Sequence, residues 1–371
     1  MARDNQSKVF YHLKRNALTA LLVIAALWLS AVLDKPISVL PALVDWNTIV
    51  TLSGLLLITT GIKESGLFSL LAYRISKRID NERILALFLI FLAAGLSMFL
   101  TNDIALFIVV PLTLNLQNIL KEDHSKIIIF EAIAVNVGSS LTPIGNPQNI
   151  FLWHQWGIRF PVFVKEMAPL VFIMAFFLLL MTFACFSTKR IQVANHHDQK
   201  VDKTLFILSV LLLVSFIVSI ELGFGRYFLA VVFLAMLAMR SDVILKPDWG
   251  LVFLFIFLFI DLNLVCQLKD SRQLLGLIDF GNKDILFLSG ALLSQAISNV
   301  PSAILLAAHS TNIKMIAYGV NVGGNGFLIA SFANLIALRF TEKGSNYFLF
   351  HLYSIPFFIV TLISSYWLFV M

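Results

Sequence analysis

The chain has 371 residues, of which 59% are hydrophobic and 13% charged, and its formal net charge is +6. A soluble domain has about 25% charged residues, so this chain has too little polar surface to cover a globule of its size. The basic residues cluster at the ends of apolar runs, which indicates membrane topology and argues against a nucleic-acid-binding face. We therefore expect an all-α polytopic protein of a bacterial cell inner (plasma) membrane.

Apolar runs long enough to cross or half-cross a bilayer recur along the whole chain. The run at 17–33 follows a basic stretch and is too long for the core of a signal peptide, so we expect an uncleaved helix there. The expected membrane segments are 17–33, 46–62, 84–100, 104–120, 127–152, 166–186, 204–221, 227–240, 249–266, 284–297, 301–308, 314–338 and 347–370. One polar stretch divides them, and it predicts a first half at 1–188, a cytoplasmic linker at 189–203 and a second half at 204–371.

The positions of Lys and Arg predict the orientation. With a cytoplasmic N-terminus, the cytoplasmic loops hold 19 of the 27 Lys and Arg residues and the opposite side holds 8. This bias places the N-terminus in the cytoplasm and the C-terminus outside. In this scheme 84–120 and 284–308 each return to the side from which they came. The second excursion is too short to cross twice, which favours a re-entrant hairpin.

Two segments separated by 185 positions resemble each other. Residues 135–151 read VNVGSSLTPIGNPQNIF and residues 320–336 read VNVGGNGFLIASFANLI, and their identities include two asparagines and a glycine. Polar hairpin tips precede both, and an Asp-Trp pair opens a helix at 46 and another at 249. The charge scheme runs these two helices in opposite directions. It therefore predicts two inverted-topology repeats, each with a re-entrant helical hairpin and a discontinuous transmembrane helix. A shared small-residue packing pattern is the alternative.

Four polar interruptions fall at membrane depth: 101–103 (TND), 142–147 (TPIGNP), 298–301 (SNVP) and 323–326 (GGNG). Backbone groups cannot stay unsatisfied in hydrocarbon, so each interruption must be buried in protein or line a cavity. Carbonyl groups freed by the prolines and by Gly145 have the chemistry to bind Na⁺. The first amides of each following helix carry partial positive charge, which suits an anion.

Carboxylates within apolar runs are the costliest residues here. Placing Asp103 at the bilayer centre costs about 2.5–3.5 kcal/mol, which favours a functional role over a helix cap at the surface. For Asp261 a proton path and a pairing with a neighbouring helix are equally open. Glu64, Glu131 and Glu221 lie near predicted helix ends, where we expect solvation. No phosphate loop, nucleophile elbow or zinc pattern is present, so we expect no enzyme and no cofactor.

These motifs resemble the ion transporter superfamily, which includes arsenite permeases, citrate-type and divalent anion:sodium symporters and one class of sodium/proton antiporters. The resemblance covers most of the chain. It implies an inverted-repeat fold, frequent dimers, and cation and solute sites at the hairpin tips and broken-helix loops. The dicarboxylate symporters have a Ser-Asn-Thr triplet at both tips. Here the third residue is Asp103 at one tip and Val300 at the other, so the first tip looks closer to the arsenite and sodium/proton branches.

The sequence thus predicts a secondary active transporter that moves a small anion or oxyanion, with Na⁺ or H⁺ as coupling ion. The expected solute-binding residues are Thr101, Asn102, Thr142, Asn146, Ser298, Asn299 and Asn325. The expected coupling-ion residues are Asn102, Asp103, Gly145 and Asn299. A sodium/proton antiporter that uses Asp103 is the alternative, and an ion channel is the alternative of another class. The expected partners are the solute, the bilayer and a second copy of the chain.

Overall fold

The computed structural model describes residues 19–67, 70, 74, 79–120, 125–190, 201–269, 278–339 and 346–371. After a first helix at Thr19–Val32, the elements are η1 (Ile37–Leu43), α2 (Trp46–Glu64), α4 (Glu82–Ser97), α5 (Asn102–Leu120), α6 (Ser125–Ser139), α7 (Pro147–Trp156), α8 (Phe160–Cys185), α9 (Lys203–Glu221), α10 (Gly225–Ile244), α11 (Trp249–Val265), α13 (Lys283–Ile297), α14 (Asn299–Ala307), α15 (Ile313–Gly323), η2 (Leu328–Ala330), α16 (Phe332–Arg339) and α17 (Asn346–Phe369). Within the described residues the only β-structure is an isolated bridge between Asn81 and Arg190.

The helices agree closely with the apolar segments that the sequence predicts. The segment 127–152 divides into α6 and α7, and the segment 314–338 divides into α15 and α16. Both breaks fall where prolines or glycines cluster in the apolar run, because several such residues close together weaken a helix more than one alone. The sequence missed the short helix η1. Most of the expected linker 189–203 lies outside the described residues.

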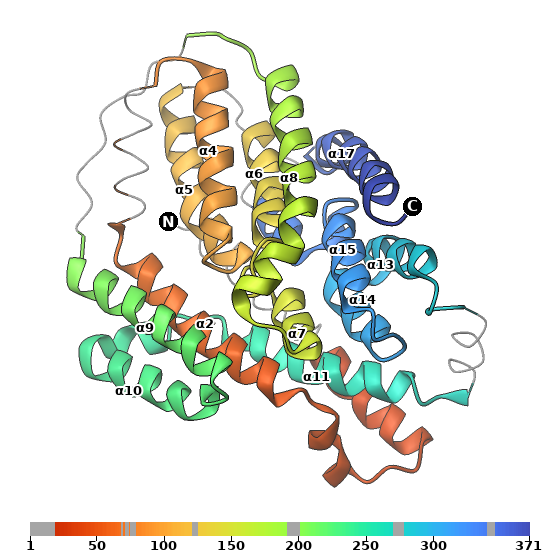
Figure 1. Ribbon diagram of the computed structural model, residues 1–371. Coiled ribbons are helices and arrows are strands. Elements are labelled where there is room, and N and C mark those ends of the chain that lie inside the picture. The colour runs from red at the N-terminus through yellow and green to blue at the C-terminus, as the bar shows by residue number, and fades with distance from the viewer. Residues whose placement is uncertain are drawn as a thin grey trace.

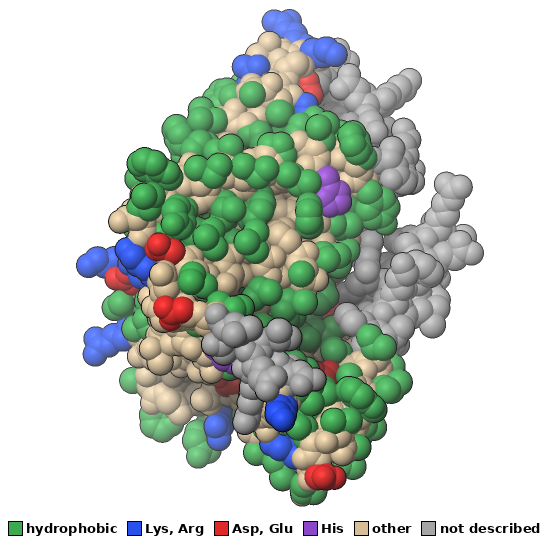
Figure 2. Space-filling model, turned by 90° about the vertical axis from the view of Figure 1, so that its right-hand side faces the viewer, with side chains coloured by type: hydrophobic (Ala, Val, Ile, Leu, Met, Phe, Trp, Pro, Cys, Tyr) green, Lys and Arg blue, Asp and Glu red, His purple; other side chains and the backbone are tan. Residues whose placement is uncertain are grey.

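The lengths of the helices and the surface of the molecule are those of a polytopic membrane protein. In the described part of the chain, four helices, α8, α9, α10 and α17, are long and apolar enough to cross a bilayer, and the bent pair of the first helix and η1 adds a fifth if it is one span. Large apolar side chains such as Phe172 and Phe348 are 74% and 76% exposed. Figure 2 shows hydrophobic side chains spread over one face, with Lys and Arg at its top, at its left margin and near its bottom. Such a surface is stable in lipid.

The helices form an upright group and a crossing group. In Figure 1, α4, α5, α6 and α8 stand side by side, and α2, α9, α10 and α11 cross beneath them. Helix α2 packs against α9, α10 and α11, and α9 packs against α10. The hairpin α4–α5 packs against α6, and the hairpin α13–α14 packs against α15. Each hairpin therefore lies against the first part of one broken helix.

Corresponding positions of the two halves have the same local structure. Asp45 caps α2 by accepting from the Thr48 amide, and Asp248 caps α11 by accepting from the Leu251 amide. A Cβ at Gly138 would lie 2.1 Å from the Ala94 carbonyl oxygen. At Gly323, the position 185 residues later, a Cβ would lie 2.8 Å from the Ala291 carbonyl oxygen. Only glycine allows such close packing of a hairpin on a broken helix.

The expectation that Glu131 is solvated at a helix end is wrong. Glu131 is 0% exposed, and among the described residues its only hydrogen bond comes from the Thr113 hydroxyl of α5. Helices α4, α5, α8, α16 and α17 all pack against α6, so none of its faces reaches solvent. The expectation holds better for Glu64, which pairs with Lys246 at 2.6 Å, and for Glu221, which accepts from the Phe160 amide.

Candidate functional site

The two broken helices meet through two asparagine pairs. Asn136 of α6 donates through Nδ2 to Oδ1 of Asn334 in α16, over 2.8 Å. Asn321 of α15 donates through Nδ2 to Oδ1 of Asn149 in α7, also over 2.8 Å. Asn136 corresponds to Asn321, 185 positions later, and Asn149 corresponds to Asn334 by the same shift. Each half therefore supplies one donor asparagine and one acceptor asparagine to the other half. All four side chains are buried.

A second pair of contacts follows the same exchange. Ser331 donates to Oδ1 of Asn136 over 3.0 Å, and Asn146 donates to Oδ1 of Asn321 over 3.2 Å. Ser331 is again 185 residues beyond Asn146. Ser140 also donates to Oδ1 of Asn321, over 3.0 Å. The predicted site residue Asn146 therefore lies inside a polar network that joins the two halves.

The network also satisfies the carbonyl groups that the first helix break exposes. Asn149 donates through Nδ2 to the carbonyl oxygens of Ser139 and Thr142, at 3.3 and 3.1 Å. An interrupted helix leaves carbonyl groups without intrahelical partners, and such groups must be paired in hydrocarbon. One amide side chain thus holds the loop between α6 and α7 in a single shape.

The second break is satisfied in the same way. Asn334 donates through Nδ2 to the carbonyl oxygens of Gly324 and Phe327, at 3.0 and 3.3 Å. These two carbonyls lie 185 positions beyond those that Asn149 binds. The two loops therefore have matching frameworks of hydrogen bonds.

The first hairpin tip contacts the first loop. The backbone amide of Asn102 donates to the Gly145 carbonyl oxygen over 2.9 Å, and Oδ1 of Asn102 accepts from the Asp103 amide over 3.0 Å. The Thr142 hydroxyl donates to the Met98 carbonyl at the end of the same hairpin arm. A Cβ at Gly145 would lie 2.3 Å from the backbone oxygen of Ser139, so this position requires glycine.

The second hairpin tip contacts the second loop. Ser298 separates α13 from α14 with a positive φ of 77°, which a serine adopts at some cost in energy. Its hydroxyl lies 3.4 Å from the Ala330 carbonyl and 3.4 Å from Oδ1 of Asn299. Ala330 corresponds to Gly145 of the first half. Helix α14 packs against α7 and α5 packs against α16, so both tips reach across to the other half.

Three predicted site residues have buried polar atoms with no hydrogen-bond partner among the residues that the structure describes. These atoms are Oγ1 of Thr101, Oδ1 of Asp103 and Oδ1 of Asn325. Nδ2 of Asn325 donates to the Asn321 carbonyl, which ties it to the asparagine network. Unpaired buried polar atoms are rare in native proteins, and they are typical of sites that bind a ligand or an ion. Their oxygens suit a hard cation or a hydrogen-bond donor.

Two further carboxylates belong to the α11 segment, Asp248 as its N-cap residue and Asp261 within the helix. Asp248 lies close enough to Asp103 for the two carboxylates to repel each other when both are charged. Both oxygens of Asp261 are buried and have no hydrogen-bond partner in the described ranges. No group of three His, Cys, Asp or Glu side chains converges within the described part of the chain. The arrangement is therefore a site of amides, hydroxyls and carbonyls with single carboxylates at its edge.

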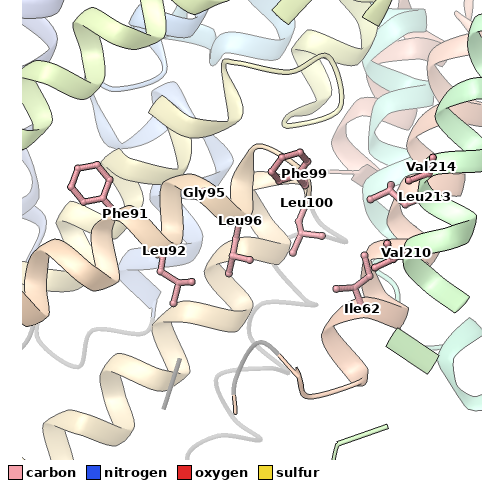
Figure 3. Close-up of a pocket in the computed structure, with 10 residues that line it drawn as sticks. All are labelled: Ile62, Phe91, Leu92, Gly95, Leu96, Phe99, Leu100, Val210, Leu213 and Val214. Atoms are coloured by element: carbon pink, nitrogen blue, oxygen red, sulfur yellow. The ribbon is translucent and has the colours of Figure 1, made fainter. Parts of the chain in front are cut away.

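Two cavities separate the crossing helices from the rest. One, of about 340 Å³, is lined by the polar residues Asp45, Gln155 and Asn263 together with apolar side chains of α7, α11 and α14. The other, of about 510 Å³, is apolar and lies between α4 and the helices α2 and α9 (Figure 3). Neither contains the asparagine network, which is closed to solvent in this conformation.

The sequence as a whole matches known membrane proteins. A family model described as "Citrate transporter" matches residues 8–314. The chain belongs to the citrate transporter family. It is 43% identical to the inner membrane protein YbiR of Escherichia coli over 85% of each chain. It is 37% identical to an uncharacterized transporter of Methanocaldococcus jannaschii over 81% of this chain and 82% of the relative. It also resembles the human P protein, 33% identical over 29% of this chain and 13% of that protein.

Membership of the citrate transporter family confirms the resemblance to the ion transporter superfamily. Together with the apolar helices, it makes the protein a multi-pass membrane transporter of the inner membrane. The relatives are named as membrane proteins and transporters rather than as enzymes.

Sequence reasoning predicted some of the site residues of this protein and missed others. The structure brings Asn102, Gly145 and Thr142 together at one tip and Ser298 with Asn299 at the other. Sequence reasoning left the four asparagines of the network, Asn136, Asn149, Asn321 and Asn334, out of the site. Their identity across 185 positions, at membrane depth, was the signal that marks them.

Proposed function

We propose that the protein is a secondary active transporter that moves a small anion or oxyanion across the inner membrane, coupled to Na⁺ or H⁺. The reciprocal asparagine pairs carry this proposal, because they join two broken helices in the same way from each half. Such an arrangement is what inverted-topology repeats produce around a midplane site. The repeats are residues 1–188 and 204–371, with the N-terminus in the cytoplasm and the C-terminus outside.

The solute binds between the two hairpin tips in this proposal. The residues that contact it are Thr101, Asn102, Thr142, Asn146, Ser298, Asn299 and Asn325. The unpaired oxygens of Thr101 and Asn325 support a ligand here, as do the helices that start at both tips. The first amides of such helices provide partial positive charge for an anion.

In this proposal the coupling ion binds at the first hairpin tip and at the corresponding second tip. Its ligands are Asn102, Asp103 and Gly145, with Asn299 at the second tip. The hydrogen bond from the Asn102 amide to the Gly145 carbonyl keeps the side chain and the carbonyl at one place. Oδ1 of Asp103 has no hydrogen-bond partner within the described residues and is available to a cation.

A sodium/proton antiporter is the second candidate function. The buried, unpaired Asp103 favours it, because one carboxylate that alternately binds Na⁺ and H⁺ is sufficient for exchange. An ion channel differs from both, since a channel dissipates a gradient and never concentrates its solute.

Flux measurements on reconstituted protein test the proposal. Purified protein in liposomes is offered radiolabelled citrate, phosphate, sulfate or arsenite under an imposed Na⁺ or H⁺ gradient. We expect one of these solutes to accumulate above its external concentration, and collapse of the gradient to stop the accumulation. Flux that only equilibrates the solute indicates a channel. Na⁺-driven alkalinisation without anion uptake indicates the antiporter.

A further inference from the structure

A fully buried carboxyl group lies outside the proposed solute and cation sites. Glu131 is 0% exposed; its Oε1 accepts from the Thr113 hydroxyl, and its Oε2 has no partner within the described residues. An isolated buried carboxylate is far less stable than its protonated form. A single neutral hydroxyl offsets only a small part of that difference. Glu131 therefore holds a proton in this conformation.

The positive charge nearest along the chain is engaged elsewhere. Lys126, one turn earlier in α6, donates to the Cys185 carbonyl and lies over the rings of Phe186 and Tyr353, at 4.6 and 5.7 Å. Phe130 makes edge-to-face contacts with the same two rings, so this cluster occupies the side of α6 that faces α8 and α17. Glu131 faces α5 instead, through Thr113.

The other helices around α6 bring no counter-charge to Glu131. In α4, Glu82 binds Ser187 and Arg83 binds the Phe186 carbonyl. In α5, Asp103 lies ten residues before Thr113, which is about 15 Å along a helix. The described side chains of α16 include no titratable group. Titratable residues of α8 and α17 beyond the Lys126 cluster make no ion pair or hydrogen bond with Glu131 within the described residues.

The position of Glu131 connects the site to one end of α6. It lies six residues after Ser125, or about 9 Å from the start of α6, and five residues before Asn136, or about 7.5 Å. The charge distribution places the start of α6 in the cytoplasm. The hydrogen bond from Thr113 also fastens the second arm of the first hairpin to the first broken helix. Glu131 therefore lies between the cytoplasm and the asparagine network, at a contact between the first hairpin and the first broken helix.

We propose that Glu131 is a proton-binding site whose loading is coupled to the packing of α5 against α6. While the helices are packed, the carboxyl group keeps its proton. When α5 moves away, water reaches the group, the O–H bond breaks and the proton passes to water, leaving a hydrated carboxylate. Repacking requires that the carboxylate take a proton back. This inference rests on the proposed function, and it adds H⁺ as a coupled ion at a place distinct from Asn102, Asp103 and Gly145.

Infrared spectroscopy of purified protein in lipid tests the proton directly and needs no solute. We expect the carbonyl stretch of a protonated carboxyl group at neutral pH in the wild type, and its loss in Glu131→Gln. If Glu131→Gln fails to fold, Glu131→Asp takes its place. This variant retains a carboxyl group, and its carbonyl stretch should be shifted from that of the wild type. The control is Glu221→Gln, which changes a carboxylate at an exposed helix end. A band that is absent from the wild type, or unchanged in Glu131→Gln, overturns the proposal.

Transport measured against pH tests the coupling. We expect wild-type uptake of the anion that accumulates to change by roughly tenfold between about pH 5.5 and about pH 8.5, and Glu131→Gln to flatten that profile to within about twofold. Glu221→Gln should keep the wild-type profile. A merely structural role for Glu131 lowers uptake equally at all pH values, which contradicts the proposal. If the wild type moves none of the anions offered, the proposed function fails, and the infrared band still decides whether Glu131 binds a proton.

Discussion

Asn136 and Asn321 each donate a hydrogen bond of 2.8 Å to an asparagine of the opposite half. Asn136 binds Asn334, and Asn321 binds Asn149, so exchanging the halves reproduces the contact. This reciprocity places the loops of both broken helices at one centre. The same contact thus forms from each side, as expected for a carrier in which each half opens in turn.

Removal of either donor asparagine should weaken the protein to a similar degree. Asn136→Ala leaves the Asn334 amide oxygen without its partner, and Asn321→Ala does the same to Asn149. Each unsatisfied buried group costs about 1–3 kcal/mol, so we expect both variants to unfold at clearly lower temperature than the wild type in detergent. Asn47→Ala is the control, because it removes only an exposed contact with Arg226. Strongly unequal losses for Asn136 and Asn321 contradict the equivalence.

Gly145→Ala should disable the first site. Its Cβ would lie 2.3 Å from the Ser139 carbonyl oxygen, so the loop must shift and the contact with the Asn102 amide must lengthen. Relieving such a steric overlap costs about 1–3 kcal/mol, so we expect uptake to fall by at least about fivefold. Gly95→Ala is the matched control, since a Cβ at Gly95 meets nothing within 4 Å. Equal uptake by the two variants in the same liposome assay shows that the loop has no role in transport.

Filling the apolar cavity beside α4 should slow transport without unfolding the protein. The cavity of about 510 Å³ lies between α4 and the helices α2 and α9, and Gly95 lines it (Figure 3). If the hairpins move against the crossing helices, Gly95→Trp obstructs that motion, whereas Gly95→Ala leaves room for it. The measurement compares initial uptake rates with thermal stability for both variants. Normal uptake by a stable Gly95→Trp protein means that the hairpin does not slide along α9.

Asp103→Asn should uncouple transport from the ion gradient. The change keeps the shape of the side chain and removes the charge that a cation requires at this buried oxygen. We expect solute to equilibrate but not accumulate, with no response to Na⁺. Wild-type dependence on Na⁺ and pH in this variant excludes Asp103 from the cation site.

The sequence predicted the helices from the apolar runs. It predicted their breaks because Pro143, Pro147 and the glycines at 323–326 interrupt two of these runs. It predicted the correspondence of the halves from the shift of 185. It did not predict which asparagine binds which, because identity across a repeat shows equivalence and not contact. Pairing across the halves depends on how the two loops are brought together, and only the fold determines that.

For Glu131 the prediction from the sequence was wrong. Its distance from a helix end in the chain suggests solvation, yet five helices enclose α6 on every side. Burial of this kind depends on helices far apart in the sequence, so no local pattern contains it. The positive φ of Ser298 was hidden for a similar reason, since the tip is fixed by contacts with the second loop.

Site-directed labelling of the first hairpin tip tests most directly whether the proposed solute site between the tips opens to each side of the membrane in turn. A single cysteine at position 101, introduced as Thr101→Cys in a protein with Cys185 and Cys266 replaced by alanine, is exposed to a membrane-impermeant maleimide from one side of sealed vesicles at a time. Alternating access predicts labelling from either side, with added solute and ion changing the two rates in opposite directions. Labelling from one side only, whatever is bound, contradicts the account.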